Sequence, residues 1–141
     1  MKLLVLGATG GVGSEIVRQA AGRAHEVTAF VRTPERLAAW RDRITVILGD
    51  LLNCGALERV VEGQDVVLSG FGPRLPISKD DRNLLSNFAR ALTSAVVARR
   101  IQRAVVVSTA FQFKDAIIPP AHLLGRLFFP SWSPTRRTWN T

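Results

Sequence analysis

A glycine-rich stretch near the N-terminus constrains the fold of this chain more than any other feature of its sequence. Residues 7–13 read Gly-Ala-Thr-Gly-Gly-Val-Gly, and they separate an apolar run at residues 3–6 from a helical pattern at residues 14–22. A glycine turn between a strand and a helix is typical of the place where a parallel α/β sheet receives a phosphate group. The alternative is a tight strand-to-helix turn in another kind of α/β protein.

The glycines of this turn have different expected roles. Gly7 permits a sharp exit from the strand, Gly10 lets backbone N–H groups approach a pyrophosphate, and Gly13 lets the helix pack closely on the strand. The N-terminus of the helix adds free N–H donors and a partial positive charge. We expect the whole turn to bind the anion through Gly7, Ala8, Thr9, Gly10, Gly11, Val12 and Gly13.

The composition narrows the class of protein. A chain of 141 residues suits one domain, and its net charge of +8 raises the question of a nucleic acid or an anionic membrane. The arginines are scattered and are not interleaved with aromatic residues. We therefore expect a solvated surface and a site for an anionic small molecule, with neither nucleic acid nor membrane as a partner.

The single cysteine, Cys54, excludes an intrachain disulfide, and no cysteine or histidine spacing predicts a metal site. The apolar run at residues 3–6 is too short for a signal sequence or a membrane span, which predicts a soluble, cytoplasmic protein.

Strand and helix signals alternate along the chain. Apolar runs predict strands at residues 3–6, 26–31, 44–48, 65–69 and 104–107. Helical patterns lie between them at residues 14–22, 34–40, 53–61 and 81–99, with Gly22 as a C-cap, Asn53 as an N-cap and Gly63 as a stop. This alternation predicts a Rossmann-like, doubly wound parallel sheet of five strands in the order 3-2-1-4-5, within a three-layer α/β/α fold.

In such sheets, ligands bind beyond the carboxyl ends of the strands, near the point where the strand order reverses. We therefore expect the residues that follow the strands to converge on one crevice. Besides the glycine turn, these are Arg32, Thr33, Arg36, Asp50, Leu51, Gly70, Phe71, Gly72, Arg74, Ser108 and Thr109.

The segment after the second strand indicates which dinucleotide binds. NAD-selective folds place an acidic residue there to bind the ribose 2′-OH, whereas this strand is followed by Arg32, with Arg36 close behind. An arginine can pair with a 2′-phosphate through two hydrogen bonds, so we predict NADP in preference to NAD. The alternative is that both are ordinary surface arginines. Asp50 is expected to accept from the adenine amino group and Leu51 to close over the ring, although Asp50 could also cap a helix.

The loop after the fourth strand is expected to border the nicotinamide ribose. Gly70 and Gly72 leave little side-chain bulk there, and Arg74 follows them. The same residues could instead form a simple glycine and proline turn.

These motifs, in this order, resemble the atypical short-chain dehydrogenase/reductases of the NAD(P)H-binding, NmrA-like type. The similarity is greatest to the biliverdin-IXβ reductase and flavin reductase group and extends over residues 1–125. It implies the Rossmann-like fold, the NADP site and hydride transfer from the nicotinamide to a flavin, a quinone or a similar acceptor. The family also includes catalytically silent redox sensors, so a nonenzymatic NADP-sensing regulator is an alternative.

Candidate catalytic residues are few. The chain has no tyrosine, which excludes the tyrosine and lysine mechanism of other short-chain dehydrogenases. The resemblance leaves Ser108 as a hydroxyl that positions the nicotinamide, although it could equally be a strand-end hydroxyl bonded to the backbone. His122 could shuttle a proton and Cys54 could have a lowered pKa, but a loop histidine and a structural cysteine are the simpler interpretations.

The C-terminus departs from the resemblance. Relatives continue through further elements that carry much of the substrate pocket, whereas residues 126–141 form an irregular tail with no helical or strand period. We therefore divide the chain into an NAD(P)-binding domain at residues 1–125 and this tail. A shifted reading of the codons for residues 131–141 permits an amphipathic helix, so we hypothesise that the tail is frameshifted and the chain truncated. The alternatives are a basic anchoring tail and a cofactor-binding fragment without turnover.

Overall fold

The computed structural model describes residues 1–72 and 79–107 of the chain, so the predicted tail at residues 126–141 lies outside the described residues. In chain order the elements are β1 (Lys2–Leu6), α1 (Gly11–Gly22), β2 (Glu26–Val31), the 3₁₀ segment η1 (Pro34–Trp40), β3 (Thr45–Leu48), α2 (Cys54–Val61), β4 (Val66–Ser69), α3 (Lys79–Ala98) and β5 (Arg103–Val106). Among these elements, no helix is both long and apolar enough to cross a membrane.

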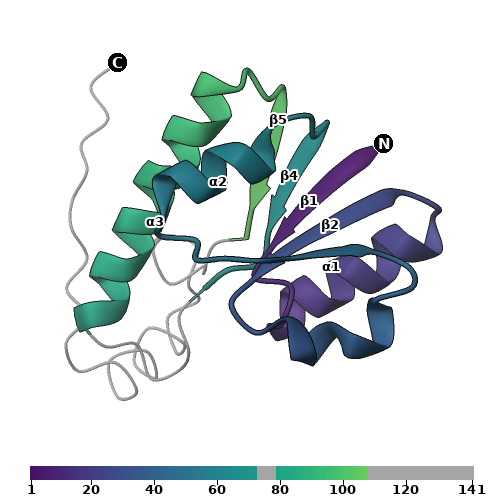
Figure 1. Ribbon diagram of the computed structural model, residues 1–141. Helices are drawn as coiled ribbons and strands as arrows, with labels where there is room; N and C mark the ends of the chain where they lie inside the picture. The colour runs from purple at the N-terminus through teal and green to yellow at the C-terminus, as the bar shows by residue number, and fades with distance from the viewer. Residues whose placement is uncertain (73–78, 108–141) are drawn as a thin grey trace, which may run out of the picture.

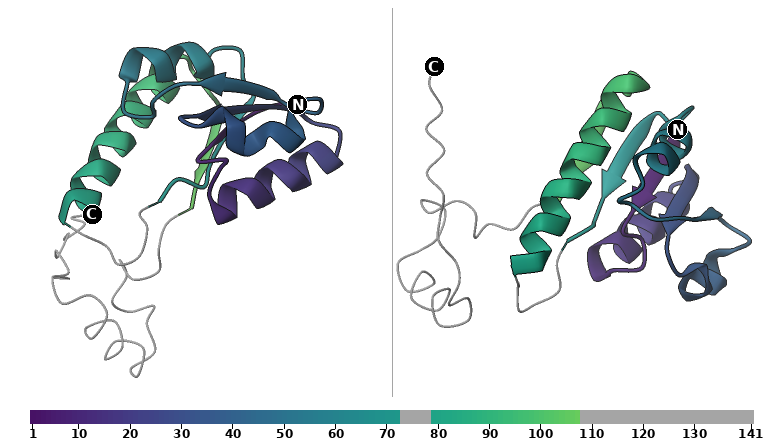
Figure 2. Two further views of the ribbon diagram at one scale, coloured as in Figure 1. Left: turned by 60° about the horizontal axis from the view of Figure 1, so that its bottom comes forward. Right: turned by 60° about the vertical axis from the view of Figure 1, so that its left-hand side comes forward.

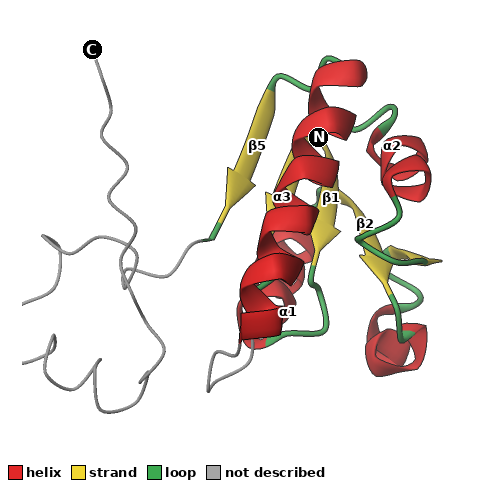
Figure 3. Cartoon of the chain, turned by 90° about the vertical axis from the view of Figure 1, so that its left-hand side faces the viewer, coloured by secondary structure: helices red, strands yellow, loops and turns green. Residues whose placement is uncertain are grey.

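The strands form one parallel sheet in the order β3-β2-β1-β4-β5, as the sequence predicts. Helices α2 and α3 cover one face of the sheet, and α1 covers the other (Figures 1 and 2). Because all the strands run in the same direction, their carboxyl ends lie at one edge of the sheet (Figure 3). The fold is therefore a Rossmann-like, three-layer α/β/α arrangement.

The core is divided by the sheet into two apolar layers. Alternate residues of β1 point to opposite faces, so Leu4 and Leu6 join the layer under α2 and α3 while Leu3 and Val5 join the layer under α1. The central strand β1 is almost completely buried, whereas the edge strand β5 is exposed along its length. This difference confirms that the apolar run at β1 reflects a strand covered on both faces.

Several predicted boundaries need correction. Helix α1 begins at Gly11, three residues before the predicted start, so the last glycines of the turn already form its first turn. Gly22 is the last helical residue and not the C-cap; the left-handed conformation falls on Ala24, with φ 56°, because the chain must turn there to enter β2. The segment at Pro34–Trp40 is a 3₁₀ segment that is interrupted at Leu37, where φ is −109°.

The N-cap of α2 follows directly from its sequence. Asn53 accepts a hydrogen bond from the backbone N–H of Ala56 at 3.0 Å through its side-chain oxygen, as the Asn53 prediction requires. We expect Asn53→Ala to lower the free energy of unfolding by about 1 kcal/mol, because it leaves that N–H without its side-chain partner. Urea denaturation would measure the loss, with Asn53→Asp as a control that keeps the acceptor. An equal loss in both variants would contradict the capping role.

Candidate cofactor site

The glycine turn follows β1 and leads straight into α1. Gly7 has a φ of +72°, which non-glycine residues rarely adopt, and its carbonyl oxygen accepts from the Gly10 N–H at 3.0 Å. The first bond of the helix then runs from the Ser14 N–H to the Gly10 carbonyl oxygen at 2.8 Å. The chain thus reverses between strand and helix within a few residues.

The turn packs closely on itself and on the segment after β4, with no side chain between the backbones. A Cβ atom on Gly13 would lie 2.0 Å from the Gly7 carbonyl oxygen, so only glycine fits where α1 crosses the end of β1. A Cβ atom on Gly70 would lie 2.7 Å from the Gly13 nitrogen, and one on Gly7 would lie 2.7 Å from the Phe71 nitrogen. The sequence interpretation gave Gly70 a role beside the nicotinamide ribose and missed this packing role. A glycine directly after β4 was the only sequence signal for it.

The N-terminus of α1 is open on its outer side. Gly10 occupies the N-cap position without a side-chain cap, and the N–H groups of Gly11, Val12 and Gly13 precede the first intrahelical hydrogen bond. A Cβ atom on Gly11 would meet nothing within 4 Å, and Val12 is 49% exposed. The uncapped donors of Gly11 and Val12, beside open space at the positive end of a helix dipole, fit the pyrophosphate of a dinucleotide.

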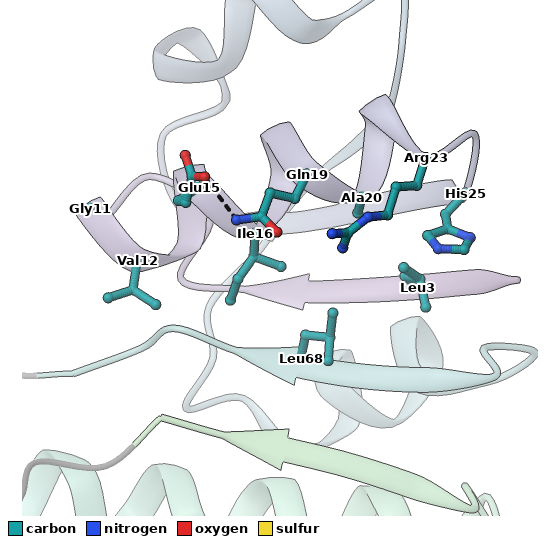
Figure 4. A pocket seen from close by; sticks show the side chains of 10 residues that line it. All are labelled: Leu3, Gly11, Val12, Glu15, Ile16, Gln19, Ala20, Arg23, His25 and Leu68. Atoms are coloured by element: carbon teal, nitrogen blue, oxygen red, sulfur yellow. Dashed lines mark hydrogen bonds between the residues drawn. The ribbon is translucent and has the colours of Figure 1, made fainter.

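An acidic side chain in the second turn of α1 does not oppose this anion site. Glu15 accepts hydrogen bonds from the Arg18 guanidinium, at 2.7 Å from Nε, and from the Gln19 side-chain amide at 2.9 Å (Figure 4). The hydrogen bonds from Arg18 and then from Gln19 lower the pKa of the Glu15 carboxyl to about 2. The carboxylate is therefore charged at neutral pH, but its charge is paired with Arg18 on the same helix.

A groove runs along α1 and ends at this site. Its walls include Ile16 and Ala20 on the helix and Leu3 and Leu68 on the sheet, as Figure 4 shows. Toward the carboxyl edge of the sheet, the groove is lined by Gly11 and Val12 only. The groove therefore adjoins the N-terminus of α1, but the predicted residues after β2 and β3 do not line it.

The residues after β2 lie beside the glycine turn. Leu6 at the end of β1 pairs with Phe30 in the parallel register, and Arg32 follows two residues later. Arg32, Thr33 and Arg36 are all exposed. Within the described part of the chain, no carboxylate lies within 4.0 Å of either guanidinium, so both charges are available to an anion.

The residues after β3 are held by local hydrogen bonds. Asp50 accepts from the Leu52 N–H at 3.0 Å, so it closes a turn before α2, while the helix cap itself is Asn53. Leu51 is only 7% exposed and packs in the core layer under α2 and α3. A contact between Leu51 and an adenine ring stays a prediction.

The loop after β4 contributes Gly70, Phe71 and Gly72 to the same edge of the sheet. The Gly70 N–H donates to the Leu6 carbonyl oxygen at 3.0 Å, which ties this loop to the end of β1. Arg74, Ser108, Thr109 and His122 lie outside the described residues. The structure thus brings the glycine turn together with the segments after β2, β3 and β4.

Two further possibilities concern the single cysteine and metal binding. Cys54 is an exposed free cysteine at the start of α2. Among residues 1–72 and 79–107, no three side chains of His, Cys, Asp or Glu gather closely enough to hold a metal ion.

Similar solved structures share this architecture. A protein from Burkholderia pseudomallei is 30% identical, with a TM-score of 0.64 over 85% of this chain and 52% of that one. A Rossmann-fold NAD(P)-binding family protein from Shigella flexneri is 23% identical, with a TM-score of 0.65 over 89% of this chain and 60% of that one. An oxidoreductase from Lactococcus lactis is 19% identical, with a TM-score of 0.70 over 91% of this chain and 58% of that one.

The chain therefore spans between 52% and 60% of the length of these structures. A family model described as NAD(P)H-binding matches residues 7–132, which include the glycine turn and every strand after β1. The match agrees with the uncapped helix N-terminus and the glycine packing at the end of β1. This chain belongs to the NAD(P)H-binding family of Rossmann-fold proteins.

Proposed function

We propose that the chain binds NADP(H) in preference to NAD(H). The observation that carries this proposal is the exposed Arg32 immediately after β2, beside the glycine turn and with no carboxylate partner in the described part of the chain. A guanidinium at this position can form two charged hydrogen bonds with a 2′-phosphate, whereas the ribose 2′-OH of NAD would require an acceptor. Arg36 supplies a second cation nearby.

In this proposal, each part of the dinucleotide lies over the end of a different strand. The pyrophosphate would lie at the N-terminus of α1, over the end of β1, and the 2′-phosphate on the side of β2. The nicotinamide ribose would then lie on the side of β4, beside Gly70 and Phe71. Asp50 remains the proposed acceptor for the adenine amino group, and the small exposed part of Leu51 remains the proposed contact of the ring.

The proposed activity is an NADPH-dependent oxidoreductase that acts on a flavin, a quinone or a similar aromatic acceptor. A bound NADPH supplies a hydride, and the protein holds the nicotinamide against the acceptor. Hydride transfer from a positioned nicotinamide needs little side-chain acid or base assistance. Resemblance to the biliverdin-IXβ reductase and flavin reductase group supports the acceptor class, and the oxidoreductase from Lactococcus lactis supports the reaction class.

The proposal is tested by following NADPH oxidation at 340 nm with FMN and with a panel of quinones, after fluorescence titration with the cofactor. Binding with turnover is the expected result. Binding without turnover on any acceptor would instead favour a nonenzymatic NADP-sensing regulator or a cofactor-binding fragment. An absence of binding would overturn both the cofactor and the activity.

A further inference from the structure

The loop after β4 is connected to α3 by a pair of aromatic rings. Phe71 is half-buried and Phe88, on α3, is only 3% exposed. Their ring centroids are 4.7 Å apart, with the ring planes tilted by 57°. Tilted rings at this separation attract each other beyond the effect of their burial alone.

The backbone of the same loop is pressed against the glycine turn. Gly7 and Phe71 are so close that a Cβ on Gly7 would lie 2.7 Å from the Phe71 nitrogen. The Phe71 N–H donates to the side-chain oxygen of Ser69 at 3.3 Å, and Ser69 is completely buried. Phe71 is therefore held from two sides, at its backbone by Ser69 and the glycine turn and at its side chain by Phe88, so loss of either contact leaves the loop less firmly placed.

The strand order separates this loop from the segment that holds the 2′-phosphate. Strands β2 and β4 flank β1 on opposite sides, so a dinucleotide centred on the end of β1 extends toward Arg32 in one direction and toward Phe71 in the other. A change in the position of Phe71 should therefore affect the nicotinamide half of the ligand and leave the adenosine half in place.

We propose that Phe88 is a positioning residue for the nicotinamide half of the bound dinucleotide, acting through Phe71. This inference rests on the proposed function, because it needs a dinucleotide at the site. Phe88 touches no part of the ligand. It holds the ring of Phe71, and this contact acts together with the Ser69 hydrogen bond to hold the loop that would border the nicotinamide ribose.

The test compares two ligands on each variant by calorimetry: NADPH and adenosine 2′,5′-bisphosphate, which lacks the nicotinamide half. For Phe88→Leu, we expect the dissociation constant of NADPH to rise about 3- to 10-fold through loss of the ring contact. The dissociation constant of the bisphosphate should stay within about twofold, since Arg32 and the turn are unchanged. Phe71→Leu changes the half-buried partner of the same ring pair. It should show the same loss of affinity for NADPH with no loss for the bisphosphate, and it replaces Phe88→Leu in the test if that variant does not fold.

The matched control is Leu92→Ala, which removes core volume one turn further along α3 from the same apolar layer, where Leu92 is 5% exposed. It should lower stability without changing the ratio of the two dissociation constants. An equal loss for both ligands in Phe88→Leu, or an unchanged NADPH affinity, would overturn the positioning role. Failure of the unmodified protein to bind the bisphosphate would overturn the proposed function itself, and the two failures are thereby distinguished.

Discussion

Gly13→Ala is expected to lower the free energy of unfolding by about 3 kcal/mol, because the new Cβ has no space. It would lie 2.0 Å from the Gly7 carbonyl oxygen and 2.6 Å from the Gly7 carbonyl carbon. Both atoms belong to the backbone of a turn that is also in contact with Gly70 and Phe71, so no side chain can move aside. Relief of the clash requires α1 to move away from the end of β1.

Urea denaturation of Gly13→Ala would measure this loss, and Gly11→Ala is its matched control. A Cβ on Gly11 meets nothing within 4 Å, so that variant should gain about 0.5–1 kcal/mol from the reduced flexibility of the unfolded chain. If Gly13→Ala, like Gly11→Ala, does not lower the free energy of unfolding, then α1 can shift without penalty and the close packing has no energetic importance.

Arg32→Ala is expected to raise the dissociation constant of NADPH about 10- to 150-fold, as the loss of a charged hydrogen bond of about 1.5–3 kcal/mol implies. The dissociation constant of NADH should change little, because NADH carries no 2′-phosphate. Fluorescence titration of both cofactors against the variant gives the two values.

Arg100→Ala is the control for the change in net charge. Arg100 lies between α3 and β5, at the amino end of the strands, and is therefore at the opposite edge of the sheet from Arg32. It should leave both affinities unchanged at moderate salt. Equal losses of NADPH and NADH binding in Arg32→Ala would remove the assignment of Arg32 to the 2′-phosphate.

The fold could be predicted because its determinants are local in the sequence. The apolar run of β1 indicates burial on both faces, Asn53 marks the start of α2, and the alternation of elements requires crossovers with one handedness. The order β3-β2-β1-β4-β5 then follows. Edge strand β5 was also predicted from its apolar residues, although the structure leaves its side chains exposed.

The parts that could not be predicted depend on how distant segments pack. The left-handed residue after α1 is Ala24 and not a glycine, because the geometry of entry into β2 decides it. Leu51 is directed into the core, although its neighbour Asp50 lies at the surface. The contact of Phe71 with Phe88 depends on the docking of α3.

Among the candidate site residues, Gly7 and Gly13 were easiest to interpret because each has a distinct steric reason. Gly7 requires a positive φ and Gly13 requires close packing, and both reasons can be stated from the position of the turn. Glycine is required at position 70 only because β4 lies beside β1, which brings the backbone of Gly70 against Gly13 of α1. This requirement cannot be seen in the local sequence. The chemistry assigned to Ser108 has no comparable support, because that residue lies outside the described residues.

The most direct measurement is a calorimetric titration of the unmodified protein with NADPH and with NADH under the same buffer and salt conditions. A glycine turn that binds pyrophosphate, with Arg32 on the 2′-phosphate, predicts one site for each cofactor and an affinity for NADPH at least about 10-fold higher. Failure to bind either cofactor, or tighter binding of NADH, would contradict an NADP site at this turn.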